Sequence, residues 1–333
     1  MKKKIAIALS LAMIMSMALT ACGNNGDKDD GPNVKTKDTK TVAVGAVVIA
    51  RDDVPEEDIY TFVSAIFENK DAITEQHAKG GELDLEFAAS VTSVPYHPGA
   101  AKYFAEKGKT VASVKDGAGV GTSKALTFGT GGDTGTYYGF GGVLSSYVSN
   151  NTGVSVTAVT SGGSQNNIEE LDAGNVQLGF VQSDVMSYAY NGERLFDKKV
   201  EGFSVVAALY MEQVQIITLN SSIKSVADLK GKNVSIGDLG SGVYFNAIDV
   251  LDAYGLTEDD IKPVYQSFGN SVDSLKDKKI DAAFVVAGAP TTAVVDLVST
   301  NTVYMVELGE DETKALLDAS PYYSAYTITA GTY

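Results

Sequence analysis

The sequence predicts an α/β fold with mainly parallel sheets, and two observations lead to this class. From residue 126 onward, apolar segments of strand length alternate with segments of helical periodicity. Three of the connections from a strand to the following helix are rich in Gly, Ser, Thr and Asn. Strands that alternate with helices form parallel sheets, and such sheets bind ligands at the carboxyl ends of their strands. The Gly-rich connections therefore mark the expected ligand-binding edge.

The first 22 residues have the pattern of a secretion signal. Three lysines precede an apolar run over residues 5–19, which is shorter than the roughly 20 residues that a membrane span needs. We expect residues 1–21 to be a signal peptide and the polar residues 22–40 to form a flexible tether. The sequence Leu-Thr-Ala-Cys that ends at Cys22 resembles the bacterial lipobox. That resemblance implies a lipidated Cys22 that anchors an extracytoplasmic protein to the cell membrane, and the alternative is an ordinary signal with an incidental cysteine.

The chain after the tether opens with a strand and two helices. Residues 42–49 are an apolar, β-branched run of strand length. An Asp/Pro start followed by apolar residues at helical spacing predicts a helix over residues 55–78, and a second helix is expected over residues 97–107. Residues 109–124 are rich in Gly and Ser, so we expect a linker there.

The alternating part follows this linker. Strands are expected at residues 126–129, 154–160, 177–181, 205–209, 214–219, 233–236, 262–266, 282–286 and 302–307. Helices are expected between them, at residues 143–149, 168–173, 185–190, 225–230, 243–253, 271–276 and 291–296.

Composition and charge exclude several classes of protein. The formal charge of −16 would repel phosphate backbones, so we expect no nucleic-acid partner. One cysteine cannot form an internal disulfide, and Cys22, His77 and His97 are too few for a four-ligand Cys/His zinc site. We expect neither a metal nor a cofactor.

Enzyme signatures are also missing from the sequence. The Gly-rich segment at residues 129–142 lacks the lysine of a phosphate loop, no segment spells a dinucleotide fingerprint, and no serine stands in Gly-x-Ser-x-Gly. His77 is expected on the surface, and His97, just before a Pro at a helix start, is expected to cap that helix or to pack in the core, and not to act in catalysis. We therefore expect a protein without catalytic residues that is not an enzyme.

The three Gly-rich connections, at residues 129–142, 160–167 and 237–242, are candidate anion-binding loops. Glycine allows backbone N–H groups to approach a bound group closely, and the start of a helix adds a partial positive charge. A single Gly-rich turn after a strand is more often structural, but a parallel sheet gathers three of them at one edge. An acidic protein that binds an anion would depend on such local donors.

Seven short stretches together resemble the TAXI family of solute-binding proteins, which serve tripartite (TRAP) transporters. They are residues 127–138, 160–168, 181–184, 208–210, 226–232 and 240–242, together with residues 96–103, which are similar to the family's C-terminal signature. The resemblance implies a two-lobed, periplasmic-binding-protein-like (type II) fold with a hinge. It also implies a lipid-anchored receptor that binds a small amino acid or carboxylate, such as glutamate or glutamine, and delivers it to TRAP membrane permease subunits.

The order of the segments departs from the family. The part that resembles the family's C-terminus, residues 41–108, here precedes the first Gly-rich loop. We interpret the chain as a circular permutation in which residues 109–124 bridge the former termini, and an inserted or misassembled segment is the alternative. Residues 41–108 would then supply a hinge strand and helices of the first lobe, with residues 125–218 as the rest of lobe 1 and residues 219–333 as lobe 2. The hinge strands would be residues 42–49 and 214–219.

The resemblance assigns candidate ligand-binding residues to four loops and one strand. They are Gly132, Thr134, Gly135, Thr136, Tyr137, Ser161, Ser164, Asn167, Gln182, Ser183, Asp184, Tyr210, Gly240, Ser241 and Gly242. In this interpretation the loops at residues 132–136, 161–167 and 240–242 donate backbone N–H and hydroxyl groups to a carboxylate, and Tyr137 and Tyr210 form walls. Asp184 would receive an ammonium group or else cap its own helix.

Two other functions stay open from the sequence. One is a ligand-sensing module that couples to a signalling partner in place of a permease. The other is an anchored hydrolase that uses a serine of one of the loops, against which the scarcity of histidine argues.

Overall fold

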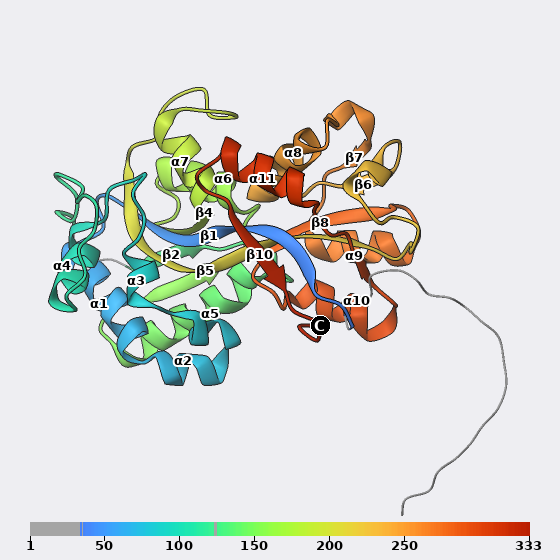
Figure 1. Ribbon diagram of the computed structural model, residues 1–333. Helices are drawn as coiled ribbons and strands as arrows, with labels where there is room; N and C mark the ends of the chain where they lie inside the picture. The colour runs from blue at the N-terminus through green and yellow to red at the C-terminus, as the bar shows by residue number, and fades with distance from the viewer. Residues whose placement is uncertain (1–33, 35, 123–124) are drawn as a thin grey trace, which may run out of the picture. The chain divides into compact units, whose positions relative to one another are not determined.

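A mixed sheet of ten strands runs through the part of the chain that the computed structural model describes, with helices on its faces (Figure 1). The described residues are Val34, residues 36–122 and residues 125–333, so the expected signal peptide and Cys22 lie outside them. Strands are ordered β3-β2-β4-β1-β5-β8-β6-β7, with β10 beside β1 and β9 beside β5. All of these elements belong to one compact unit, residues 31–333.

The two ends of the sheet are parallel, as the α/β class requires. At one end β2 pairs with β3 and β4, and at the other β6 pairs with β7 and β8, always in parallel. These strands are β2 (Leu126–Gly129), β3 (Val156–Val159), β4 (Leu178–Gln182), β6 (Asn233–Ser235), β7 (Lys262–Val264) and β8 (Ala282–Ala287). The predicted α/β class is confirmed.

Two long antiparallel strands join these ends. β1 (Thr39–Arg51) pairs with β4 through its second half and with β10 (Ser324–Ile328) through its first. β5 (Phe203–Thr218) pairs with β1 through its first half and with β8 and β9 (Tyr304–Met305) through its second.

The prediction of two strands at residues 205–209 and 214–219 was wrong, because β5 runs through the expected break without interruption. The intervening Tyr210, Glu212 and Gln213 are buried at 1–2% exposure. β1 also begins at Thr39, inside the segment expected to be tether.

The helices agree in place with the sequence pattern but not always in extent. They are α1 (Glu56–Glu68), α2 (Lys70–Gln76), α3 (Leu85–Ala88), α4 (Pro98–Glu106), α5 (Thr136–Asn151), α6 (Ser164–Asp172), α7 (Ser183–Asn191), α8 (Gly242–Ala253), α9 (Phe268–Lys276), α10 (Thr292–Thr300) and α11 (Glu310–Ala319), with 3₁₀ turns η1 (Ala78–Glu82), η2 (Val226–Leu229) and η3 (Glu258–Asp260). The helix expected over residues 55–78 is broken at Asn69, whose backbone is not helical and whose Nδ2 donates to the Ala65 carbonyl. α5 begins at Thr136, so the second half of the Gly-rich segment 129–142 is helical.

Residues 41–108 pack into the same core as the residues after the linker. Phe62 of α1 lies edge-on to Phe128 of β2, with ring centroids 6.2 Å apart, and Phe128 stacks on Phe180 of β4 at 4.9 Å. β1 supplies the sheet strand between β4 and β5. The segment is therefore part of the sheet and does not form a domain of its own.

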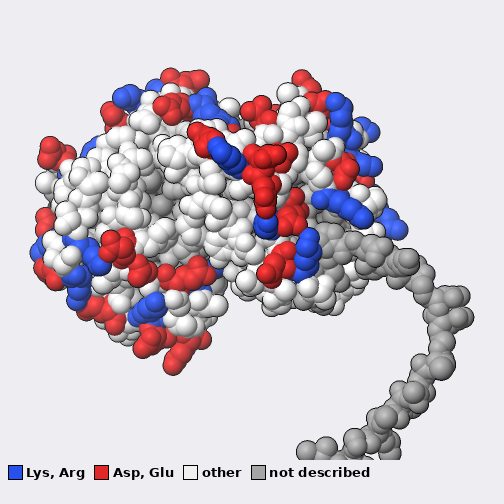
Figure 2. All heavy atoms as spheres, viewed as in Figure 1, with Lys and Arg blue, Asp and Glu red and all other residues white. Residues whose placement is uncertain are grey.

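Acidic and basic side chains are interspersed over the face of the molecule in Figure 2, without a broad basic patch. Among the residues that the structure describes, no helix combines the length and the apolar character needed to cross a membrane.

Candidate functional site

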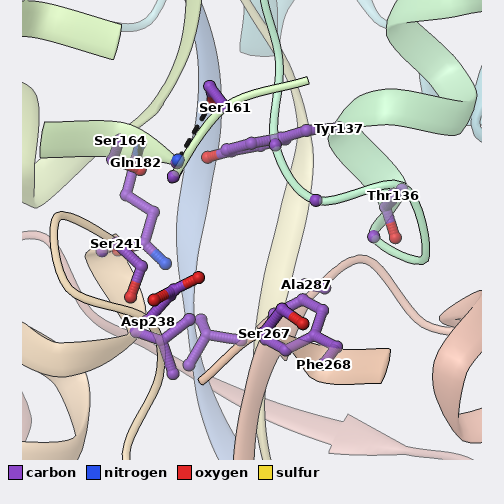
Figure 3. Close-up of a pocket in the computed structure, with 18 of the residues that line it drawn as sticks. Thr136, Tyr137, Ser161, Ser164, Gln182, Asp238, Ser241, Ser267, Phe268 and Ala287 are labelled. Carbon is purple, nitrogen blue, oxygen red and sulfur yellow. Dashed lines mark hydrogen bonds between the residues drawn. The ribbon is translucent and has the colours of Figure 1, made fainter. Parts of the chain in front are cut away.

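A small pocket lies where the two parallel ends of the sheet face each other, with β1 and β5 passing behind it (Figure 3). Its volume is about 70 Å³. Figure 3 shows Tyr137 and Gln182 extending toward it from one side, while Asp238, Ser241 and Phe268 lie on the other. The lining comprises Gly131, Gly132, Thr134, Gly135, Thr136, Tyr137, Ser161, Gly162, Gly163, Ser164, Gln182, Glu212, Asp238, Ser241, Gly242, Val243, Gln266, Ser267, Phe268, Val286 and Ala287.

Direct hydrogen bonds join the two sides of the pocket. The Asn166 N–H donates to the Gly240 carbonyl at 3.0 Å, and Thr136 Oγ1 donates to the Gly288 carbonyl at 2.8 Å. The Ala293 N–H donates to the Thr134 carbonyl at 3.2 Å. These three bonds join elements on opposite sides of the pocket.

Four helices begin at the pocket wall. α5, α6, α8 and α9 each start at a lining residue, respectively Thr136, Ser164, Gly242 and Phe268. The first N–H groups of a helix have no partner within the helix, and the helix dipole places partial positive charge there. The N-cap residues of α5, α6 and α8 provide no side-chain cap to these groups, whereas Ser267 caps α9. The arrangement suits an anionic group such as a carboxylate.

Glycine is required at the start of α6. Gly163, the N-cap of α6, has φ 105°, a conformation that residues with a Cβ rarely adopt. A Cβ there would also contact the backbone of Ser241 at 3.4 Å. The chain thus brings the α6 and α8 starts together at the pocket.

Two buried polar side chains of the lining have unpartnered atoms among the described residues. They are Gln182 Oε1 and Ser241 Oγ, in side chains of residues that are 2% and 7% exposed. A buried polar atom without a hydrogen bond costs free energy. A polar ligand in the pocket would remove that cost.

Glu212 is a buried acid of the pocket that the sequence analysis missed. It lies in the middle of β5 and accepts a 2.6 Å hydrogen bond from the Tyr137 hydroxyl at Oε2. Burial raises the pKa of Glu212 to about 8, against the opposing effect of the Tyr137 bond. The signal for it was an acid inside an apolar strand, which the expected break at residues 210–213 concealed.

Ten of the fifteen predicted site residues line the pocket. They are Gly132, Thr134, Gly135, Thr136, Tyr137, Ser161, Ser164, Gln182, Ser241 and Gly242. The structure adds Glu212, Asp238 and residues 266–268 to them. The last group follows β7 and could have been found by the same rule, because it too stands at the carboxyl end of a parallel strand.

Four of the other five predicted residues lie outside the lining and make contacts that stabilise the structure around the pocket. Asn167 Nδ2 donates to the Thr130 and Phe180 carbonyls at 2.7 Å each, and Ser183 Oγ accepts from the Gly45 N–H. Tyr210 is buried beneath Lys79, whose Nζ lies 5.3 Å from the ring centroid, and the Gly240 carbonyl makes the closing bond to Asn166.

Asp184, the predicted ammonium acceptor, does not line the pocket either. It lies fully buried in the first turn of α7, where Asn246 Nδ2 of α8 donates to its Oδ2 at 2.9 Å. The same Nδ2 reaches the Tyr323 hydroxyl at 2.9 Å, and that hydroxyl donates to Asp249. Burial raises the pKa of Asp184 to about 7, against backbone N–H donors that lower it.

Replacing Asp184 by Asn should make unfolding free energy less dependent on pH. The folded pKa lies above the unfolded value of about 3.9, so the stabilising contribution of Asp184 is complete below about pH 4 and is lost as pH rises through 7. Asn mimics the protonated form. In urea titrations, the unfolding free energy of the variant minus that of the wild type should increase by about 2 kcal/mol from pH 5 to pH 8. An equal difference at the two pH values would refute this.

His97 agrees with its prediction as a helix cap. Its Nδ1 accepts the Gly99 N–H at the start of α4, and its Nε2 lies 3.0 Å from the Val54 carbonyl oxygen. Burial lowers the pKa of His97 to about 4, so the ring is neutral at physiological pH. It lies outside the pocket lining.

Comparison with known proteins gives one family and several distant structures. The model of the NMT1-like family matches residues 28–108 and 128–333. The alkanesulfonate-binding protein SsuA from Xanthomonas axonopodis pv. citri, solved with MOPS, is 21% identical over 57% of this chain and 62% of its own, with a TM-score of 0.39. The periplasmic aliphatic sulphonate binding protein SsuA from Escherichia coli is 18% identical over 56% and 60%, with a TM-score of 0.35. The present chain thus spans less than two thirds of the length of either SsuA protein.

Proposed function

Because the chain belongs to the NMT1-like family, we propose that it is an extracytoplasmic solute-binding protein of a transporter that holds a small carboxylate-bearing solute in the pocket. The family is one of periplasmic solute-binding proteins and not of enzymes. The single observation that carries the ligand class is the convergence of four helix starts on one pocket, three of them without a side-chain cap.

The binding residues in this proposal are the ten predicted residues that line the pocket, together with Glu212. Thr136, Ser164 and Gly242 begin the three uncapped helices and would donate backbone N–H groups to the carboxylate. Tyr137 forms a wall, since its ring stacks on Phe180 at 4.7 Å and its hydroxyl is engaged by Glu212.

Isothermal titration calorimetry tests the ligand class. The panel is glutamate, glutamine and the C4 and C5 dicarboxylates, added to the purified protein. We expect heat of binding from at least one of them. Absence of both binding heat and thermal stabilisation with every member would contradict the proposed ligand class.

The pocket suggests two lobes that close over the solute. One lobe would hold β2–β4 and the helices of residues 41–108, and the other β6–β8, with β1 and β5 as hinge strands. This assignment is supported by the strand order, in which β1 pairs with β4 at one parallel end, β5 pairs with β8 at the other, and the two strands pair with each other. Opening would break the bonds between Asn166 and Gly240 and between Thr136 and Gly288.

In more specific terms, we propose that the chain is a member of the TAXI family and delivers glutamate or glutamine to a TRAP permease. This proposal is supported by the motif set, because the residues of its Gly-rich loops line one pocket. A multispanning TRAP permease encoded beside this protein would support it, and a transporter gene of another class there would count against it.

The circular permutation is part of the same proposal. It is supported by the pairing of β10 with the start of β1, which places the two segments side by side, and by the Ala330 N–H donating to Asp38 at 2.8 Å. In the unpermuted order these two segments would be joined, so they must lie close together for a permuted chain to keep its contacts. A variant with residues 125–333 placed before residues 31–108 should fold and bind the same solute, and failure of that variant to fold would contradict the permutation.

Anchoring through a lipidated Cys22 rests on the lipobox resemblance, since that residue lies outside the described part of the chain. Replacement of Cys22 by Ser should release the protein from the membrane fraction. Unchanged membrane association of this variant would refute the anchor.

A further inference from the structure

The pocket lining carries acidic side chains and no basic ones. Its ionisable acids are Glu212 and Asp238, and no Lys, Arg or His belongs to the lining among the described residues. Within the described lining, positive charge comes from the helix starts, each equivalent to roughly half an elementary charge. A dianionic solute would therefore face two carboxyl groups with no side chain to neutralise it.

Glu212 is the acid that lacks a counterion. It is 2% exposed, and within the described chain no Lys, Arg or His forms an ion pair with it. Lys79 is near enough to act on it electrostatically, but the Lys79 Nζ is held by Glu82 Oε1 at 2.6 Å and by the Ala289 carbonyl at 2.9 Å. Buried carboxylates in proteins are paired or neutralised. Glu212 has a neutral partner, the Tyr137 hydroxyl, and an open pocket beside it.

A second acceptor belongs to the same lining. Gln182 Oε1 has no partner among the described residues and comes from the end of β4, one strand away from β1 and two from β5. An ammonium group has three N–H donors and no acceptor, so it needs several oxygen atoms around it. Glu212 and Gln182 can supply them, and the helix starts can hold an attached carboxylate.

We infer that Glu212 receives a positively charged nitrogen of the solute, so that the pocket selects zwitterionic amino acids over acids of the same skeleton that lack an amine. This inference rests on the proposed function, since it concerns the same pocket. It replaces Asp184 as the ammonium acceptor, because Asp184 lies outside the lining and is engaged by Asn246.

The inference also predicts that Glu212 releases a proton when an amino acid binds. Burial raises the pKa of Glu212 to about 8, so the empty pocket holds a neutral carboxyl at pH 7. The titratable groups that act on it are Tyr137 of α5, Tyr210 of its own strand, Asp184 of α7 and Lys79 of η1. An arriving ammonium favours the charged carboxylate, which releases a proton. Affinity for an amino acid should therefore rise with pH from 6 to 8.

The experiment compares matched pairs of solutes by calorimetry. The pairs are glutamate with glutarate, aspartate with succinate and alanine with propionate, each differing only by the amine. They are titrated at pH 6, 7 and 8 into the wild type, Glu212→Gln and Asp184→Asn, after circular dichroism has established that both variants are folded. Glu212→Gln keeps the size and the acceptor for Tyr137 but cannot become charged.

We expect the wild type to prefer at least one amino acid over its amine-free partner by tenfold or more, with proton release on binding. Glu212→Gln should lose this preference and the rise with pH, whereas Asp184→Asn should retain both. The inference is overturned if the wild type binds the amine-free acids equally well or better, if Glu212→Gln weakens both members of a pair equally, or if Asp184→Asn is the variant that loses the preference.

The proposed function can fail separately. Tight binding of glutarate, succinate or propionate without any amine preference would leave the proposed function in place and overturn the role of Glu212. No binding of any of the six acids would contradict the proposed ligand class and the inference together. If Glu212→Gln does not fold, Glu212→Asp takes its place. Asp keeps a carboxyl group but holds it one methylene farther from the solute. This variant should show a weaker amine preference and still depend on pH.

Discussion

Replacing Gly242 by Ala is expected to weaken solute binding strongly and to leave the protein folded. A Cβ at this position would lie 2.0 Å from Gln182 Oε1, 2.4 Å from Gln182 Cδ and 2.9 Å from Ser164 Oγ. Real side chains do not approach so closely, so the Gln182 amide must move. The space beside it is the pocket, which the displaced amide would enter.

The effect on binding should be large for a second reason. Gly242 is the first residue of α8 and one of three uncapped helix starts at the pocket, so a methyl group there also separates α8 from α6. We expect affinity to fall by about a hundredfold, or about 2.7 kcal/mol. Both clashing groups are side chains, so the thermal unfolding midpoint should change little.

Calorimetry with the best-binding acid of the panel checks this prediction. Gly142→Ala is the matched control, because Gly142 lies within α5 and a Cβ there would contact nothing within 4 Å. The control should bind like the wild type. Undiminished binding by Gly242→Ala would show that the solute is bound elsewhere.

Replacing Gly99 by Ala should cause the largest loss of stability among the alanine substitutions considered. Gly99 lies in the first turn of α4, where the helix touches α1. A Cβ would lie 2.1 Å from the Glu56 carbonyl oxygen and 2.8 Å from the Tyr60 nitrogen, which are both backbone atoms. Backbone cannot rotate away as a side chain can, so the two helices must separate. We expect a loss of about 3 kcal/mol, since overpacking of a dense core costs about 1–3 kcal/mol and this contact is severe.

Gly142→Ala also serves as the control for stability, and there we expect a gain in unfolding free energy. Gly142→Ala removes a helix-interior glycine at an open position and should stabilise the protein by up to about 1 kcal/mol. Urea unfolding of the two variants measures both effects. A Gly99→Ala variant as stable as the wild type would mean that α1 and α4 do not pack as described.

Much of this architecture could be predicted from the sequence because its signals are local. Apolar runs such as residues 126–129 and 282–286 are strands at nearly the expected bounds. The Gly-rich loops meet at one pocket because they follow parallel strands, which is a rule of topology and needs no side-chain detail. For the same reason ten of the fifteen expected residues line that pocket.

The errors arise where tertiary packing decides. Two strands were expected, at residues 205–209 and 214–219, but β1 and β8 pair along β5 and keep it extended through the interval between them. The break at Asn69 and the early start of α5 have no strong local signal. β10 lacks the alternating pattern of a half-buried strand, and its pairing with β1 joins positions almost 300 residues apart, so local patterns do not predict it.

Asp184 and Glu212 illustrate the limit most clearly. Asp184 directly follows a strand, where ligand residues are expected, yet it turns toward Asn246 of α8. Glu212 lies inside a strand, where ligand residues are not expected, yet it lines the pocket. Which acid faces the pocket depends on strand register, and sequence periodicity alone does not give the register of a long central strand.

A crystal structure of the protein grown with the tightest-binding acid of the titration panel tests the solute site most directly. We expect the solute inside the pocket, with its carboxylate within hydrogen-bond distance of N–H groups in the first turns of α5, α6 and α8. A solute bound outside this pocket, or one whose carboxylate points away from these three helix starts, would contradict the proposed site.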